Sequence, residues 1–361
     1  MNRHPLHSLC PYFATFPESF VAKQLGHLKK SGVVFDPFCG RGTTLFEATL
    51  HGFPAAGTDT NPVAVCISNA KLNPPALADV LHRLERLEQS WKASDTRYRA
   101  AEFFRLCYNP MTLRQLQFLR QRLHWRTNEI DCFISAMALW SLHGESHRSP
   151  NYFSNRMPRT ISTKPQYSIK WWRVHKCTAP LRDVFAILRR MAHYRLRMPV
   201  PEVRGRVAEL DAREAYKAFP SLAGTICAVI TSPPYLDTTD YHEDQWLRLW
   251  FLGGLEKPSN SQSDDRHTNS EQYWEFLADA WAGVAPLLAS SAIVAIRIGG
   301  KYLRLESVRK RLEFSLSQGL QRRVKSVGGG SISIFEGGQR VSFHSNAGRG
   351  VSREFDFKFL V

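Results

Sequence analysis

The chain has 361 residues, enough for one large domain or two, and 43% of them are apolar, with dispersed glycine and proline, which indicates a folded rather than a disordered protein. Lysine and arginine number 48 against 32 acidic residues, giving a formal net charge of +16. Such an excess suits a surface that neutralises phosphates. Charge of this kind also serves solubility alone, but the clustering described below favours nucleic acid as the partner.

The cysteines and histidines exclude several classes of protein. The seven cysteines are odd in number and contain no Cys-x-x-Cys pair, so neither a disulfide framework nor a zinc ribbon is expected. The thirteen histidines form no metal-ligand spacing, and we predict no metal. The amino-terminal segment lacks the apolar core of a signal peptide, and no run reaches membrane-spanning length. We therefore expect a cytoplasmic protein with no membrane partner.

The first predicted elements open a doubly wound sheet. Apolar residues at helical spacing predict a helix within 16–30, and 33–35 reads as a buried strand. A glycine-containing loop follows, then a helix over 44–50 and a second short strand that ends at Asp59. Strand, glycine loop, helix, strand and acidic residue is the opening of a doubly wound, mostly parallel α/β sheet.

The middle of the chain breaks this pattern. Residues 76–199 read as a helical and basic insert, and the strand pattern then returns. The remaining elements expected are strands at 205–211, 226–230 and 292–298, a polar loop at 253–272 that is either a substrate lid or idle, and a terminal antiparallel hairpin within 327–361. We expect one catalytic domain made of 1–75 and 200–361, with the insert as candidate target-recognition region.

One part of the insert, residues 147–176, contains no Asp or Glu. Its aromatic residues alternate with lysines and arginines, a composition that suits contact with phosphates and stacking on bases. The alternative is a solvated basic surface with Trp171 and Trp172 packed into the core. The candidate DNA-binding residues are Arg148, Arg156, Arg159, Lys164, Lys170, Arg173 and Lys176.

Two strand ends predict a nucleoside-type ligand. Asp36-Pro-Phe-Cys-Gly-Arg-Gly-Thr43 follows the first strand, and its glycines let the backbone approach a ligand closely. The loop is neither a GxGxxG fingerprint nor a Walker A loop, so a phosphate cradle is not expected. Its leading carboxylate suits a ligand with an ammonium group. Asp59, twenty-three positions later, stands where a carboxylate binds ribose hydroxyls in nucleotide-type folds.

A third motif, Thr231-Ser-Pro-Pro-Tyr235, follows another buried strand. The three motifs, in this order, resemble those of the S-adenosylmethionine-dependent amino-methyltransferases that methylate exocyclic nitrogens of DNA bases. In that family the first motif holds the methionine part of the cofactor, the acidic residue after the second strand holds its ribose, and the Pro-Pro motif grips a flipped base. The resemblance covers about 12–75 and 203–300.

Carried over to matching positions, the resemblance implies two sets of residues. The implied cofactor-binding residues are Phe16, Pro17, Asp36, Phe38, Gly40, Gly42, Thr43, Asp59, Asn61, Pro62, Asp211 and Thr231. The implied catalytic residues are Ser232, Pro233, Pro234 and Tyr235. S-adenosylmethionine is the implied cofactor and double-stranded DNA the implied partner, with a cognate restriction endonuclease or other defence subunits as further partners.

The chemistry of amine methylation explains these residue types. The amine lone pair is delocalised into the base and must be localised by fixed acceptors, which two prolines aim rigidly. Tyr235 would give a flipped base a stacking face. A carbon-5 cytosine methylase needs a cysteine nucleophile after the prolines, and position 235 is Tyr, so that chemistry is excluded.

Within the family, Ser at the position of Ser232 goes mostly with the N4 amine of cytosine. We therefore expect a site-specific DNA cytosine-N4 methyltransferase that transfers the methyl in line, as part of a restriction-modification or phage-defence system. The alternatives are an N6-adenine DNA methyltransferase, an RNA base N-methyltransferase and a non-catalytic DNA-recognition subunit.

Overall fold

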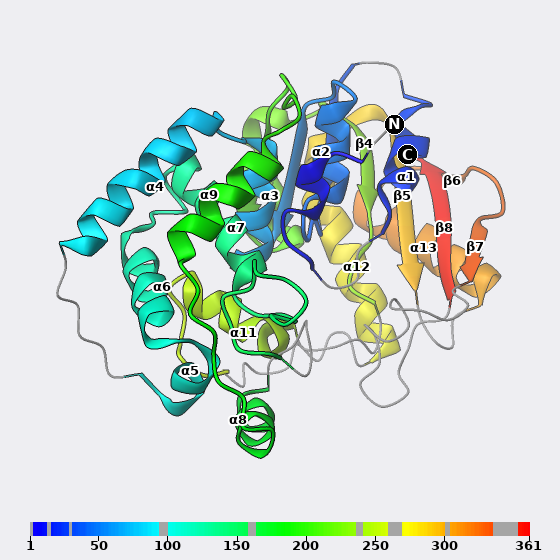
Figure 1. The fold of residues 1–361 in the computed structure, drawn as a ribbon. Helices are drawn as coiled ribbons and strands as arrows, with labels where there is room; N and C mark the ends of the chain where they lie inside the picture. Colours follow the sequence, from blue (N-terminus) through cyan, green and yellow to red (C-terminus); the bar gives the residue numbers. More distant parts are fainter. Residues whose placement is uncertain are drawn as a thin grey trace. The chain divides into compact units, whose positions relative to one another are not determined.

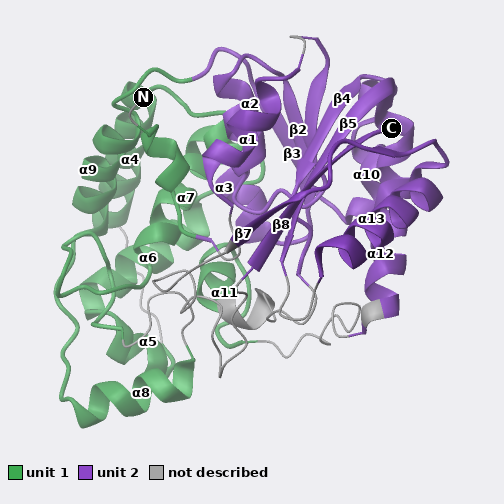
Figure 2. Ribbon diagram, turned by 90° about the vertical axis from the view of Figure 1, so that its right-hand side faces the viewer, with its two compact units in different colours: residues 1–11, 69–200, 240–261 green, residues 12–68, 201–239, 262–361 purple. Residues whose placement is uncertain are grey.

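The structure is a computed structural model that describes residues 3–12, 16–28, 31–93, 100–157, 164–235, 241–258, 269–299, 304–334 and 353–361. The chain divides into two compact units. Residues 12–68, 201–239 and 262–361 form one, here called the α/β unit, and residues 1–11, 69–200 and 240–261 form the other, the helical unit (Figure 2).

A single mixed sheet runs through the α/β unit. Its strands are β1 (Val33–Asp36), β2 (Ala55–Asp59), β3 (Gly205–Glu209), β4 (Ile226–Thr231), β5 (Leu288–Gly299), β6 (Lys325–Ser326), β7 (Ser331–Ile334) and β8 (Arg353–Leu360). They lie in the order β3-β2-β1-β4-β5-β8-β6, with β7 also paired to β8. Strands β1 to β5 are mutually parallel, whereas β8 runs antiparallel to β5, β6 and β7. The expected doubly wound α/β fold with terminal antiparallel strands is confirmed.

The strand order reverses between β1 and β4. From β1 the chain moves outward through β2 to β3, and it then returns to pair β4 with the other edge of β1. In open α/β sheets, ligands bind beyond the carboxyl ends of the strands at such a point, because the two flanking connections leave the sheet on opposite faces.

Helices cover the sheet on both sides (Figures 1 and 2). On one side α1 (Glu18–Leu25) packs against α2 (Thr43–Leu50), and α3 (Pro62–Leu72) begins. On the other, α12 (Ser270–Val284) packs against α13 (Leu305–Leu320) and α10 (Ala215–Ala218). Short 3-10 turns lie at Ala212–Glu214, Pro220–Leu222 and Ala285–Leu287.

Apolar and charged side chains alternate along β8, so each type faces a different side of the sheet. Phe355, Phe357 and Phe359 are buried in the apolar cluster under α12 and α13. The alternate residues, Glu354, Asp356 and Lys358, point to the opposite face because successive strand side chains alternate. The last strand therefore supplies core on one face and charged groups, two carboxylates among them, on the other.

The helical unit contains the short turn η1 (Pro5–Ser8), the end of α3, and seven further helices in its described residues. These are α4 (Leu77–Lys92), α5 (Glu102–Cys107), α6 (Pro110–Arg122), α7 (Glu129–Ser141), α8 (Pro165–Val174), α9 (Val184–Arg195) and α11 (Tyr241–Phe251). Side chains of Asn109, Asn128 and Asp183 cap the first turns of α6, α7 and α9.

Three details differ from the sequence expectations. The helical unit begins at residue 69 rather than 76, and it also includes 1–11 and 240–261, which the sequence placed with the catalytic domain. The polar loop expected to reach residue 272 gives way to α12 at Ser270, while 259–268 lie outside the described residues. Most of that candidate lid is therefore not described.

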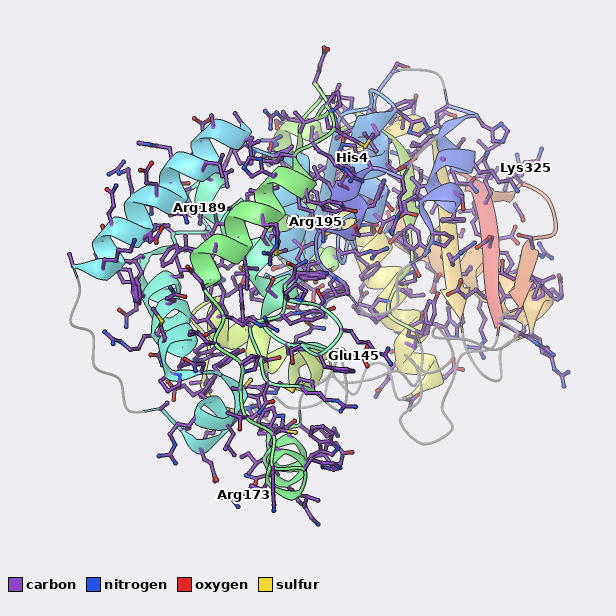
Figure 3. All side chains as sticks on the ribbon, viewed as in Figure 1. His4, Glu145, Arg173, Arg189, Arg195 and Lys325 are labelled. Atoms are coloured by element: carbon purple, nitrogen blue, oxygen red, sulfur yellow. The ribbon has the colours of Figure 1, made fainter. Side chains whose placement is uncertain are left out.

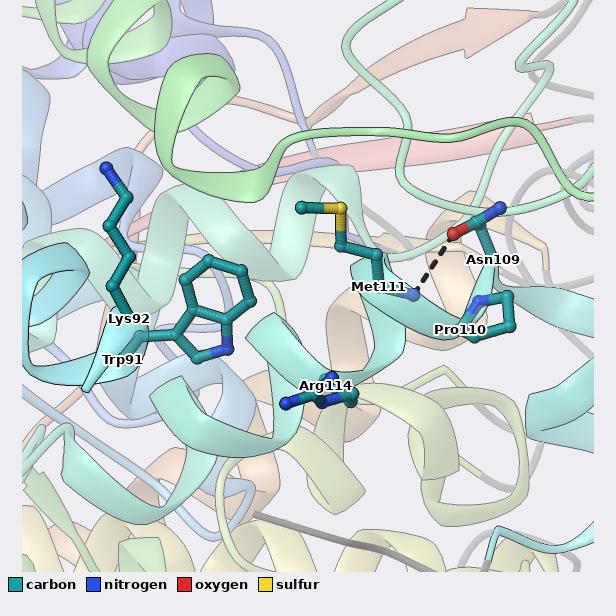
Figure 4. A pocket seen from close by; sticks show the side chains of 6 residues that line it. All are labelled: Trp91, Lys92, Asn109, Pro110, Met111 and Arg114. Carbon is teal, nitrogen blue, oxygen red and sulfur yellow. Dashed lines mark hydrogen bonds between the residues drawn. The ribbon is translucent and has the colours of Figure 1, made fainter. Parts of the chain in front are cut away.

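The described helices include none that is both long and apolar enough to cross a membrane. A recess of about 610 Å³ lies in the helical unit, lined by Trp91, Lys92, Asn109, Pro110, Met111 and Arg114 (Figure 4). The Asn109 side chain there accepts the Met111 amide at 3.0 Å, the bond that begins α6. None of these residues belongs to the predicted site.

Replacing Phe357 by Ala is expected to destabilise the protein by about 3–5 kcal/mol, because the ring is 3% exposed and its loss leaves a cavity in the core of the α/β unit. Phe314→Ala is the matched control, since that ring is 64% exposed on α13 and should change stability little. Urea unfolding measures both. Equal effects of the two substitutions would contradict this account of the core.

Candidate active site

Three parallel strands end together at the strand-order reversal. β1 ends at Asp36 and β2 at Asp59, and β4, which pairs with β1 on the other side, ends at Thr231. Because parallel strands in register end at the same edge, the loops that follow them meet there. These loops are the three motifs singled out in the sequence.

Asp36 is the most buried acidic group of this edge, at 1% exposure. Its Oδ1 accepts the Phe38 amide at 3.1 Å and the Thr231 hydroxyl at 2.6 Å, whereas Oδ2 has no hydrogen-bond partner among the described residues. Burial raises the pKa of Asp36 to about 7, against the opposing effect of these hydrogen bonds. A buried carboxylate with one free oxygen is suited to bind a cationic donor.

Asp59 holds the loop with both carboxylate oxygens. Oδ2 accepts the Gly40 amide at 2.8 Å, and Oδ1 accepts the Asn61 amide at 2.9 Å. Burial raises the pKa of Asp59 to about 6, although the two amide bonds act the other way. Each oxygen retains a further lone pair for a hydroxyl donor.

The loop after β1 is built against its neighbours. Cys39 donates its amide to the Thr58 carbonyl at 3.0 Å, and Thr58 donates its hydroxyl to the Pro37 carbonyl at 2.9 Å. Gly57 on β2 is required here, since a Cβ at that position would lie 2.5 Å from the Asp36 carbonyl oxygen. This close approach of β2 to the loop had no recognised signal in the sequence.

Position 42 requires glycine for two structural reasons. Its φ is +69°, which non-glycine residues rarely adopt, and a Cβ would lie 2.7 Å from the Ser68 hydroxyl. That hydroxyl donates to the Gly40 carbonyl at 2.8 Å, so it fixes the turn into α2. The glycines predicted to bring backbone near a ligand thus also let α3 pack on the loop.

Asn61 begins α3 beside Pro62. Its Oδ1 accepts the Val63 amide at 2.9 Å, whereas its buried Nδ2 has no partner among the described residues. Asp36 and Asn61 therefore offer one free acceptor and one free donor, both shielded from water. Buried polar atoms without partners are costly, and a bound polar ligand would supply those partners.

The other predicted cofactor residues have mixed surroundings. Phe16 packs edge-on against Phe20 at 5.4 Å between ring centres, just before Pro17 caps α1. Phe38 lies 5.8 Å from the Phe276 ring, and Thr43 is the buried first residue of α2. Asp211 forms a two-point ion pair with Arg213 at 2.9 and 3.0 Å. Their cofactor roles stay predictions.

The Ser232–Tyr235 turn is anchored to the first motif. Besides the Thr231–Asp36 bond, Thr44 of α2 donates to the Ile230 carbonyl at 3.0 Å. Ser232 and Pro234 are half-buried, and Pro233 is buried. The end of β4 is thus held against the loop that would bind a cofactor.

Tyr235 lies in the core rather than on a surface. Its ring is 2% exposed, and its hydroxyl donates to Glu354 Oε1 at 3.0 Å. The Ser232 hydroxyl in turn donates to the Tyr235 oxygen at 3.4 Å. Stacking of a flipped base on this ring, as the sequence predicts, would require the ring to be uncovered first.

The sequence analysis missed the polar groups behind Tyr235. Arg297 of β5 binds Asp356 of β8 through two bonds of 2.6 and 2.7 Å, and it lies 3.3 Å from Glu354. The alternation of 353–361 was a usable signal, because it separates these carboxylates from the phenylalanines. Only the pairing of β8 with β5 brings them to Arg297 and the turn.

The basic segment of the helical unit is largely surface. The described candidates Arg148, Arg156, Lys170, Arg173 and Lys176 are exposed, Lys164 is half-buried, and Arg159 lies outside the described residues. Two of them pair with acidic residues from outside the segment, Arg148 with Glu145 and Arg173 with Glu102. Figure 3 labels one member of each pair, Glu145 and Arg173. Of the other three exposed candidates, the Arg156 guanidinium lies over the Trp171 ring, and Lys170 and Lys176 are exposed cations on or next to α8.

The aromatic residues of this segment divide between core and surface. Trp172 is buried, and its indole nitrogen donates to the Arg156 carbonyl at 2.6 Å. Trp171 is half-buried, stacks on His175 at 4.3 Å and has the Arg156 guanidinium 5.6 Å from its ring. Tyr167 is 49% exposed. The alternative with both tryptophans packed into the core therefore holds for Trp172, whereas Trp171 is only half-buried.

Among the described residues, no group of three or more His, Cys, Asp or Glu side chains is placed to hold a metal ion. Asp36, Asp59 and Asp211 are engaged with amides, a hydroxyl and an arginine, as described above.

Asp36→Asn is expected to reduce the pH dependence of stability. Because the folded-state pKa of about 7 lies above the ordinary 3.8, the contribution of Asp36 to stability is full below 3.8 and is lost as pH rises through about 7. Asn keeps the Oδ1 acceptor and stays neutral, so the variant should gain stability relative to wild type as pH rises over this range.

Urea unfolding midpoints between about pH 4 and pH 8 measure this difference. Asp279→Asn, at an exposed position of α12, is the control and should follow wild type. Parallel curves for wild type and Asp36→Asn would show that the burial of Asp36 does not govern its ionisation.

Comparison with known proteins gives a short sequence match and distant structural likenesses. No family model matches the chain. The Type II methyltransferase M.MvaI of Kocuria varians is 39% identical over 57 residues, which are 16% of this chain and only 13% of that protein. The chain thus matches about an eighth of that relative's length.

Among solved structures, the rRNA methyltransferase aviRa from Streptomyces viridochromogenes has 11% identity and a TM-score of 0.37, covering 97% of this chain and 87% of its own. TYW2 of M. jannaschii, in complex with AdoMet, has 9% identity and a TM-score of 0.32, covering 96% and 78%. Likeness at this level carries no information on substrate.

Proposed function

We propose that this chain is an S-adenosylmethionine-dependent methyltransferase that methylates the exocyclic N4 amine of cytosine in duplex DNA. The observation that carries the proposal is the meeting of three strand ends. There Asp36 has one buried carboxylate oxygen with no partner among the described residues, and its other oxygen accepts the hydroxyl of Thr231, the residue before the Ser-Pro-Pro-Tyr turn. The short match to a type II methyltransferase supports the same class of reaction.

The cofactor brings a methyl group on a positive sulfonium. In this proposal Asp36 Oδ2 accepts the cofactor's ammonium group, and Asp59 accepts ribose hydroxyls with the lone pairs that its two amide bonds leave free. Asn61 Nδ2 supplies a buried donor to the same ligand. Asp211 faces the adenine, a role that its ion pair with Arg213 would have to accommodate.

The Ser232–Tyr235 turn holds the amine. Ser232 accepts an amine hydrogen, and the rigid prolines aim their carbonyls at the same group, so that the lone pair is localised on nitrogen. Transfer then takes place in line, with no covalent intermediate on the protein. The Thr231–Asp36 and Thr44–Ile230 bonds keep turn and cofactor loop in fixed register.

The exposed cations of the helical unit give the DNA contact. Lys170 and Lys176 lie close to Tyr167 in sequence, and basic groups next to an exposed ring suit a phosphate backbone near a displaced base. The proposal includes a biological role: the chain modifies DNA as part of a restriction-modification system with a cognate restriction endonuclease, or as part of another defence system. N6-adenine and RNA base methylation are the competing substrates.

The test is label transfer from tritiated S-adenosylmethionine to duplex DNA or RNA, followed by nucleoside analysis. Label in N4-methylcytosine of DNA is the expected result. Label in N6-methyladenine of DNA would mean that the target base is adenine rather than cytosine. Label in RNA alone would mean that the substrate is RNA rather than DNA. Tight DNA binding without any transfer would indicate a DNA-recognition subunit without catalytic activity.

Asp59→Ala should weaken S-adenosylmethionine binding by at least about tenfold, the equivalent of one lost charge-assisted hydrogen-bond site, while leaving DNA affinity unchanged. Isothermal titration with the cofactor and fluorescence anisotropy with a DNA duplex measure the two affinities. Glu209→Ala, at the end of β3, is the control for charge at the sheet edge. Unaltered cofactor affinity in Asp59→Ala would remove Asp59 from the site.

Replacing Lys170 and Lys176 by Ala should weaken DNA binding and lower the slope of log affinity against log salt by about one unit for each lost phosphate contact. The control replaces Lys310 and Lys325, which are exposed lysines of the α/β unit. Anisotropy titrations of a DNA duplex at several salt concentrations give the slopes. The same loss in both double variants would mean that the net charge, not this segment, determines binding.

A further inference from the structure

A chain of hydrogen bonds leads from Ser232 into the α/β unit. The Ser232 hydroxyl donates to the Tyr235 oxygen at 3.4 Å, and the Tyr235 hydroxyl donates to Glu354 Oε1 at 3.0 Å. Both bonds point the same way, from the turn toward the carboxylate. A proton accepted at Ser232 can therefore move along this chain by successive exchange of hydroxyl protons.

The phenol is suited to pass a proton in this manner. Burial, together with the nearby Glu354 charge, raises the pKa of Tyr235 well above its usual range, so the phenol stays protonated. It can release its proton to Glu354 only while taking one from Ser232. Tyr235 would thus carry a proton without ionising.

Of the two carboxylates at Arg297, Glu354 makes the longer contact. Arg297 is shared by two carboxylates, and its bonds to Asp356, at 2.6 and 2.7 Å, are shorter than its 3.3 Å contact with Glu354. Burial alone would lower the pKa of Arg297, but its bonds to Asp356 and the two carboxylate charges outweigh burial and raise it. The guanidinium therefore stays charged.

Glu354 can accept a proton without breaking the bridge between β5 and β8. The Arg297–Asp356 pair has two bonds of 2.6 and 2.7 Å, and neither involves Glu354. Lys358, two residues after Asp356, is directed to the same face of the strand because successive strand side chains alternate. Arg297 therefore keeps its tighter pair whether Glu354 is charged or neutral.

We propose that Glu354 is the proton acceptor of the methyl-transfer reaction and that Ser232 and Tyr235 relay the proton to it. This inference rests on the proposed function. As the methyl carbon leaves sulfur and bonds to the amine nitrogen, one amine proton passes to Ser232 Oγ, the Ser232 proton passes to the Tyr235 oxygen, and the Tyr235 proton passes to Glu354. The sulfur keeps the electron pair of the broken bond, and both hydroxyls end the step unchanged.

Glu354→Gln separates proton acceptance from positioning. The Gln side chain has the same shape, and its oxygen still accepts the Tyr235 hydroxyl, but it cannot take up the proton. We expect the single-turnover rate of methyl transfer to fall about 100-fold, the usual contribution of a general base, with the Kd of S-adenosylmethionine and of DNA changed less than about twofold. The solvent isotope effect on that rate should also change.

Tyr235→Phe is the second variant, because it keeps the buried ring and removes only the relay oxygen. A similar loss of rate is expected. Glu313→Gln is the matched control, since that carboxylate pairs with Arg309 on α13, away from the relay, and its rate should equal that of wild type.

The proposal and the function on which it rests fail in different ways. No transfer to nucleic acid by the wild-type chain would remove the proposed function and the relay with it. Normal wild-type transfer with an unchanged rate in Glu354→Gln would overturn the relay alone and leave Glu354 a structural group. If Glu354→Gln fails to bind cofactor, an unchanged rate in Tyr235→Phe would overturn the relay by itself.

Discussion

The candidate site depends on one hydrogen bond between two strands. Thr231 ends β4 and donates its hydroxyl to Asp36, which ends β1, at 2.6 Å. Because these strands flank the point where the strand order reverses, the bond ties the loop that follows the first strand to the turn that follows the fourth. In a methyltransferase these two segments have to hold cofactor and acceptor in line, and small displacements between them would slow the reaction.

The same bond explains why the two carboxylate oxygens of Asp36 have different surroundings. The Thr231 hydroxyl and the Phe38 amide bind one oxygen of Asp36, and the other, also buried, has no hydrogen-bond partner in the part of the chain that the structure describes. Burying a carboxylate with only one oxygen hydrogen-bonded is unfavourable, and the same burial raises the pKa of Asp36. Such sites are uncommon in cores that serve packing alone, and they occur where a protein is built to receive a ligand.

The antiparallel strand β8 completes the other side of the site. Its phenylalanines close the core beneath α12 and α13, while its carboxylates meet Arg297 and Tyr235 on the opposite face. One strand therefore supports the sheet and supplies the polar groups behind the turn. A parallel strand in that place would have directed the same alternating sequence along β5 in the other sense, and Glu354 would not lie opposite Gly299 at the end of β5.

Much of the α/β framework could be read from local sequence. Strand and helix periodicity, the glycine loop and the turn prolines are short-range signals, and they located β1 to β5 and the three motifs within a few residues. In α11 the buried residues are Trp246, Leu247, Trp250 and Phe251, whereas Leu249 is half-buried. This spacing of three and four residues fits the 3.6 residues of a helical turn.

What the sequence determined by itself were the strand ends and the residue types placed on them, since both depend on neighbours in the chain. The tertiary structure decided which of these groups remain open to a ligand and which bind one another. It left Asp36 Oδ2 without a partner among the residues that the structure describes, turned Tyr235 into the core, and joined Glu354 to Tyr235 across more than a hundred residues of chain. Strand order and pairing across long stretches of chain set those contacts, and no local pattern encodes them.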